Sequence, residues 1–181
     1  MQAEQDAPRG LLRSSAVVGS MTMLSRVLGL ARDVILAAVL GASANADAFF
    51  VAFKIPNFLR RLFAEGAFSQ AFVPVLAEQR EAGGGAAVRD FVDHVAGALA
   101  AVLITLTTVT VLAAPLVAAI FAPGFIGQGE KFTLTADLIR ITFPYLMLIS
   151  FTGMCGAILN SYGRFAVPAF TPVLLNLSLI G

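Results

Sequence analysis

The chain has 181 residues, of which 58% are hydrophobic and only 13% are charged, and its mean hydropathy is +0.86. A soluble domain is about 45–50% apolar and about 25% charged, so we expect this chain to be embedded in a bilayer. Its net charge of +1 argues against a nucleic-acid partner. Its single cysteine and single histidine exclude a disulfide framework and a His/Cys metal site.

The first 13 residues are polar and are expected to form a cytoplasmic tail, and the apolar sequence begins at Ser14. The stretch that follows is not a secretory signal. Arg26, Arg32 and Asp33 lie inside it, whereas the apolar core of a signal peptide must be uncharged. We therefore interpret residues 14–40 as the first membrane span.

Four further spans are expected, at about residues 47–78, 94–121, 134–162 and 167–181. No charged residue occurs in the stretches 95–129, 141–163 and 165–181. About 20 apolar residues are enough to cross the ~30 Å hydrocarbon core. The sequence thus predicts an all-α fold, a polytopic bundle of transmembrane helices.

Several breaks are expected within this pattern. The second span would be about 48 Å long if straight, so we expect a kink near Pro56 and an interfacial segment after Gly66. Residues 79–92 are polar and are predicted to form a loop, and Pro144 is predicted to bend the fourth span. Asp137 and Arg140 are spaced i,i+3 and are expected to form a local ion pair.

The distribution of basic residues predicts the orientation of the chain. Only Lys131 falls on one side of the predicted spans, whereas the other side collects Arg9, Arg13, Arg80, Arg89 and Arg164. The side rich in arginine is expected to be cytoplasmic, so the N-terminus lies inside. Because the last apolar run reaches Gly181 without a flanking charge, we expect the chain to be the N-terminal part of a longer protein.

Charged residues inside the first span indicate a functional surface. On a helical wheel, one polar stripe contains Ser25, Arg26, Gly29, Arg32 and Asp33. A lone charge at the bilayer centre costs about 2.5–3.5 kcal/mol, and Arg26 lies roughly 20 Å along the helix from Arg13. Arg26 and Asp33 are about 10 Å apart on one face, so both can address a group between them.

The second span has a similar polar arc of about 120°, which contains Asp47, Lys54, Asn57, Arg61, Glu65 and Ser69. Arg60 lies about 100° from this arc, and the expected kink leaves open whether Arg60 or Arg61 faces the same way. The two spans together would line a cationic cavity suited to an anionic ligand, since arginine binds two phosphate oxygens at once. The alternative is that these charges pair among themselves and hold the two helices together.

Residues 21–33, 46–57 and 59–74 resemble the MurJ (MviN) family, and shorter similarities occur at 143–145 and 156–160. This family belongs to the multidrug/oligosaccharidyl-lipid/polysaccharide exporter superfamily and has fourteen transmembrane helices in two lobes. The resemblance implies a flippase of the bacterial inner membrane. Its substrate would be lipid II, an undecaprenyl diphosphate with a disaccharide-pentapeptide, which alternating access brings to the outer leaflet for cell-wall synthesis.

The resemblance also implies roles for individual residues. The positions that match the diphosphate-binding arginines of the family are Arg26, Arg32 and Arg60, with Asp47 at the outer turn. The polar stripes add further candidates for the substrate site, namely Asp33, Lys54, Asn57, Arg61 and Glu65. The family has another arginine on its eighth helix and a cation site in its second lobe, which this chain lacks, so we do not expect the chain to transport by itself.

Two alternatives to this function stay open at this point. One is a flippase for another polyprenyl-diphosphate oligosaccharide of the O-antigen type, because all such lipids share the diphosphate. The other is a membrane scaffold without transport activity, which should tolerate Arg26→Ala. An enzyme is not expected, and neither is a cofactor, since no nucleophile–base pair, P-loop or dinucleotide fingerprint is present.

Overall fold

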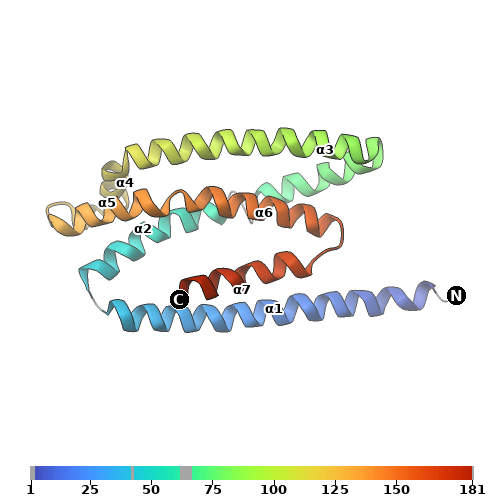
Figure 1. Cartoon of the computed structure of the whole chain (residues 1–181), viewed down its shortest axis with the longest axis horizontal. Helices are drawn as coiled ribbons and strands as arrows, with labels where there is room; N and C mark the ends of the chain where they lie inside the picture. The colour runs from blue at the N-terminus through green and yellow to red at the C-terminus, as the bar shows by residue number, and fades with distance from the viewer. Residues whose placement is uncertain (1–2, 42, 62–66, 181) are drawn as a thin grey trace. The chain divides into compact units, whose positions relative to one another are not determined.

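The computed structural model describes residues 3–41, 43–61 and 67–180, and these ranges form helices and no strand (Figure 1). The all-α prediction is therefore confirmed. The chain divides into two compact units, which are described separately. One unit contains the first and the last helix, and the other contains residues 42–158.

The first unit pairs α1 (Ala3–Leu40) with α7 (Ala166–Ile180). Helix α1 has 38 residues and is about 57 Å long, so most of the polar segment before Ser14 belongs to the same helix. The two helices lie side by side and run in the same direction, as expected of a first and a fifth span (Figure 1). The buried side chains of α7 are Val173 and Asn176.

The second unit begins with α2 (Ala44–Arg60), whose N-cap is Ser43. The Ala46 amide donates to Ser43 Oγ at 3.2 Å, which satisfies one of the free N–H groups of the first turn. The helix continues through Pro56 to Arg60. It packs on α5 (Glu130–Thr142).

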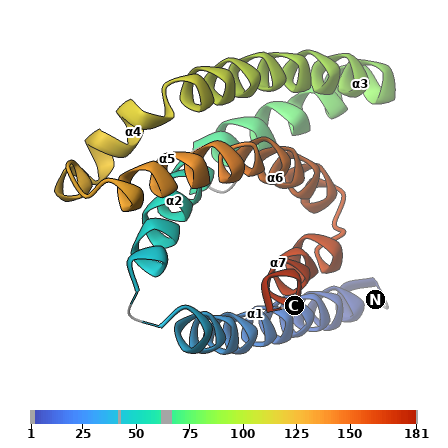
Figure 2. The ribbon, with the colours of Figure 1, turned by 60° about the vertical axis from the view of Figure 1, so that its left-hand side comes forward.

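Helix α3 (Ala67–Leu112) consists of two antiparallel arms that meet at Gly84 (Figures 1 and 2). Gly84 has φ 64° and ψ −153°, a conformation that is essentially restricted to glycine. The predicted loop over residues 79–92 is therefore wrong, because the arms are helical up to this turn. The polar residues lie on the two helix ends that form the tip of this hairpin. The helical conformation is interrupted only at Gly84 within α3.

Proline residues set the remaining breaks. The predicted third span is divided into the end of α3 and α4 (Ala114–Phe121), since Pro115 cannot donate to the preceding turn. A short 3₁₀ turn, η2 (Pro123–Phe125), follows. Pro144 separates α5 from α6 (Tyr145–Ser161), which agrees with the predicted bend.

A small-residue and aliphatic core holds the second unit together. Phe72 of the first α3 arm stacks between Phe68 and Phe91, with ring centroids 5.2 and 5.5 Å apart. The other buried residues of this core include Ala52, Ile55, Leu76, Leu103, Ile139, Phe143, Leu146, Met154 and Ala157. Small residues such as Ala52 are suited to the close packing of α2 on α5, as in other membrane helix pairs.

Two helical stretches, Phe68–Leu112 and Glu130–Ser161, are long and apolar enough to cross a membrane by length and composition. Only 17% and 28% of their most apolar windows are buried inside the chain. The core helix of a soluble protein would be mostly buried, so these surfaces are suited to lipid or to further protein. Helix α7 is also apolar but shorter.

Candidate functional site

Part of the polar stripe of α1 contacts α7 at a single amide side chain, that of Asn176. Arg32 Nη1 donates to Asn176 Oδ1 at 3.1 Å. The Asn176 amide nitrogen in turn donates to the Ser25 carbonyl oxygen at 2.9 Å and lies 3.3 Å from Ser25 Oγ. Gly29 lies between these contacts, and a Cβ atom there would be 3.7 Å from the amide nitrogen. Such a Cβ would make only an ordinary van der Waals contact, so Gly29 lies against Asn176 but this packing does not require a glycine.

Arg32 also pairs with its neighbour in sequence, Asp33. The guanidinium Nε and Nη2 atoms lie 3.0 and 2.7 Å from the same carboxylate oxygen, Oδ1. The Arg32 side chain is 23% exposed and that of Asp33 is 63% exposed. The helical wheel did not indicate this pair. Within the first unit, Asp33 is thus already engaged by one of the basic residues of the stripe.

Arg26 differs from Arg32 in its surroundings. It is exposed on α1, and it has no hydrogen-bond or ion-pair partner among the residues that the structure describes. It lies near the middle of the predicted first span, where an unpaired guanidinium is costly in lipid. Its side chain is therefore available to an anionic ligand or to protein beyond the described ranges.

The predicted residues of α2 separate into two groups. At the start of the helix, Asp47 Oδ2 lies 2.7 Å from Lys131 Nζ, in the first turn of α5. The Lys131 ammonium also lies 4.1 Å from the Phe125 ring centroid, a cation–π contact. The sequence placed Lys131 only in an outer loop, whereas the structure shows it as the partner of a predicted site residue.

The second group lies towards the end of α2. Arg60 Nε donates to Asn57 Oδ1 at 3.1 Å, an i,i+3 contact. Lys54 and Arg61 are exposed, and Lys54 has no hydrogen-bond or ion-pair partner within the described part of the chain. Glu65 lies outside the described residues. The choice between Arg60 and Arg61 as the cavity residue stays open.

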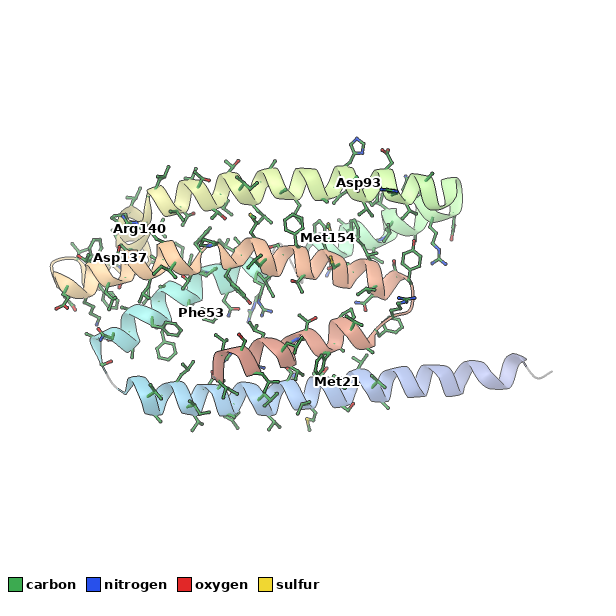
Figure 3. All side chains as sticks on the ribbon, viewed as in Figure 1. Met21, Phe53, Asp93, Asp137, Arg140 and Met154 are labelled. Atoms are coloured by element: carbon green, nitrogen blue, oxygen red, sulfur yellow. The ribbon has the colours of Figure 1, made fainter. Side chains whose placement is uncertain are left out.

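Asp137 and Arg140, both labelled in Figure 3, lie on α5 of the second unit. Arg140 Nη1 lies 2.6 Å from Asp137 Oδ1, so the predicted i,i+3 pair is confirmed. Phe53 of α2 stacks on Phe49 and on Tyr145, with centroid distances of 5.8 and 6.2 Å. The second contact places Phe53 against Tyr145, the first residue of α6.

The α1 stripe and the α2 arc belong to different units, so their common cavity stays a prediction. Sequence reasoning missed Asn176 and the Asp47 contact of Lys131. A signal for Asn176 existed, because it is a strongly polar amide in an otherwise apolar span, where such residues hydrogen-bond to a neighbouring helix. Lys131 offered no such signal, since a basic residue in a short loop is common.

Comparison with known proteins agrees with these features. A family model described as lipid II flippase MurJ matches residues 36–181. A probable lipid II flippase MurJ from Vibrio cholerae is 48% identical over 98% of this chain. A lipid II flippase MurJ from Burkholderia cenocepacia is 47% identical over 94% of this chain, and a probable one from Buchnera aphidicola is 44% identical over 94%.

The chain spans about a third of the length of these curated relatives, namely 35% of the Vibrio protein and 33% of the Burkholderia protein. The Vibrio match also covers the polar stripe of α1. This stripe lies before residue 36, where the family-model match begins. The chain therefore belongs to the family of MurJ lipid II flippases, which are membrane proteins.

Proposed function

We propose that this chain forms the N-terminal third of a lipid II flippase in the bacterial inner membrane. The full-length protein would move lipid II from the cytoplasmic to the outer leaflet by alternating access around a cationic cavity. The names of the relatives and their coverage of nearly the whole chain support the substrate class. No side chain would act as a catalyst in this process, because no covalent bond of the lipid changes.

The observation that carries this proposal is an excess of basic side chains over their acidic partners. Among the described site residues, Asp33 is engaged by Arg32 and Asp47 by Lys131. Arg26 and Lys54 are left without a partner in the same ranges. A diphosphate would supply the missing negative charge, and basic groups near the bilayer centre gain most from such a partner.

The chemistry of the individual residues fits this role. Arg26, Arg32 and Arg60 each offer a planar guanidinium, which can donate two parallel hydrogen bonds to phosphate oxygens. Lys54 would add a single point charge, whereas Asn57 would orient Arg60 through its side-chain oxygen. Asp33 and Asp47 would limit the positive charge and keep the empty cavity from binding any anion too tightly.

The orientation belongs to the same proposal. We propose a cytoplasmic N-terminus, with the Gly84 turn and its neighbours Arg80 and Arg89 also inside. The distribution of basic residues places the segments around Asp47 and Lys131 on the outer side. The contact between these two residues brings the segments together, which supports this assignment.

The test replaces Arg26 in the full-length protein and measures growth of flippase-depleted cells, protein level and binding of undecaprenyl diphosphate. Arg26→Ala should abolish growth and weaken binding at a normal protein level, and Arg26→Lys should restore part of both. The matched control is Arg164→Ala, which removes an exposed arginine outside both polar stripes and should leave growth and binding unchanged.

Three outcomes would contradict the proposal. Normal growth and binding with a well-expressed Arg26→Ala variant would exclude this arginine from the site. Loss of the variant protein would favour the purely structural account of the charges. Failure of the unmodified full-length gene to replace the flippase would favour another polyprenyl-diphosphate substrate.

A further inference from the structure

We propose that Asn176 of α7 is a positioning residue, which holds the Arg32 guanidinium in place for the diphosphate without neutralising its charge. This inference rests on the proposed function, because it assigns a purpose to the orientation of Arg32. Its evidence is independent of that function and comes from the contacts between α1 and α7.

The hydrogen-bonding capacity of Asn176 is matched to its surroundings. Its oxygen accepts from Arg32 Nη1, and its nitrogen donates to the carbonyl oxygen and lies within reach of the hydroxyl oxygen of Ser25. Arginine can only donate and a carbonyl oxygen can only accept. Only one of the two amide orientations therefore satisfies both neighbours, and the side chain is fixed at both ends.

Burial makes these contacts important. Asn176 is only 6% exposed, although it lies in a helix whose other described residues are mostly apolar. A buried amide without partners is unfavourable, so this side chain favours the one packing of α1 on α7 that provides them. The same packing fixes the position of Arg32, whose side chain is 23% exposed.

Arg32 keeps N–H donors that are not engaged by Asn176 or Asp33 and that can bind a ligand. A guanidinium has five N–H donors, and the described contacts use three of them, one to Asn176 and two to Asp33. One donor therefore remains on each of the two terminal nitrogens. Two donors on different nitrogens are what bidentate binding of a phosphate requires.

The neutrality of Asn176 distinguishes it from the other partner of Arg32. Asp33 already places one carboxylate on the guanidinium. A second carboxylate in the position of Asn176 would keep the acceptor for Arg32 but would compete with a diphosphate for the positive charge. An amide can orient the arginine through its oxygen and leave that charge for the substrate.

The experiment is a double-mutant cycle in the full-length protein, with binding of undecaprenyl diphosphate as the readout. Asn176→Leu should weaken binding about tenfold, the loss expected when an arginine keeps its charge but not its orientation. In an Arg32→Ala background, Asn176→Leu should cause no further loss, because the effect acts through Arg32. The matched control Asn160→Leu makes the same change at an exposed position and should bind normally.

Asn176→Asp is the second variant, and it keeps the side-chain size and the acceptor for Arg32. It loses the donor to the Ser25 carbonyl oxygen, so thermal unfolding is measured beside binding. The folded variant should bind the diphosphate more weakly than the unmodified protein, whereas a merely structural role predicts normal binding by any folded variant. The same cycle measured on thermal unfolding without ligand shows whether Asn176 and Arg32 are coupled.

The outcomes separate the two proposals. Normal diphosphate binding by folded Asn176→Leu and Asn176→Asp variants would overturn the positioning role, and so would equal losses with and without Arg32. If the unmodified protein did not bind undecaprenyl diphosphate at all, the proposed function would fail and the positioning role with it. Coupling in thermal unfolding would then identify the Asn176–Arg32 contact as structural.

Discussion

Lys131 Nζ lies 2.7 Å from Asp47 Oδ2 and joins the first turn of α5 to the first turn of α2 across 84 residues of sequence. The lysine is 15% exposed and the aspartate 61%, so one end of the pair is sheltered and the other is open. Asp47 also lies where the partial positive charge of a helix N-terminus favours a carboxylate. The structure thus gives this predicted site residue a role in joining two helices.

We predict that Lys131→Met lowers the stability of the full-length protein by about 1 kcal/mol, since a partly exposed ion pair and a cation–π contact are each worth about that much or less. Thermal unfolding in detergent measures the effect, which should shrink at high salt. Glu130→Gln, which removes an exposed charge from the neighbouring position, is the matched control. Equal losses from Asp47→Asn with and without Lys131 would show that the contact contributes nothing.

The three glycines at the α3 turn should respond differently to alanine. Gly84→Ala places a side chain at φ 64° and should cost about 1–3 kcal/mol. Gly83→Ala brings a new Cβ within 2.4 Å of the Ala87 Cβ, so the turn must shift. Gly85→Ala meets nothing within 4 Å and serves as the control.

Protein level and thermal unfolding of the three full-length variants measure these effects. Gly85→Ala should be about as stable as the unmodified protein and more stable than the other two variants. A Gly84→Ala variant as stable as Gly85→Ala would mean that the reversal of α3 does not depend on the left-handed conformation.

Cysteine labelling tests the proposed orientation. The background is Cys155→Ser, because Cys155 is an exposed free thiol. Asn45→Cys avoids the capping side chain of Ser43, and Gly85→Cys avoids the strained Gly84. A membrane-impermeant thiol reagent should label Asn45→Cys in intact cells and should label Gly85→Cys only after permeabilisation. The reverse pattern would place the N-terminus outside.

Local sequence rules accounted for the helices and for contacts within one turn. The charge-free stretches predicted helical spans, Pro144 marked a break, and the spacing of Asp137 and Arg140 predicted their ion pair. Each of these depends on residues that are close in sequence. The error at residues 79–92 has the same origin, because a polar stretch was interpreted as a loop when it covers two helix ends.

Contacts between distant helices could not be predicted in this way. Asn176 is 144 residues from Arg32 and Lys131 is 84 residues from Asp47, and helical periodicity gives the direction of a side chain but not the helix that it meets. The wheel correctly grouped Ser25, Gly29 and Arg32 on one face of α1. It could not show that an amide from α7 would lie against that face.

The separation between Arg32 and Asn176 has a consequence for the synthesis of the protein. A ribosome adds about 5–20 residues per second, so roughly 7–30 s pass between the two residues. During this interval α1 is already made, but its polar face has no α7 to pack on. The insertion machinery must therefore shield Ser25 and Arg32 from lipid, or α1 must stay at the membrane surface, until the last helix of this chain emerges.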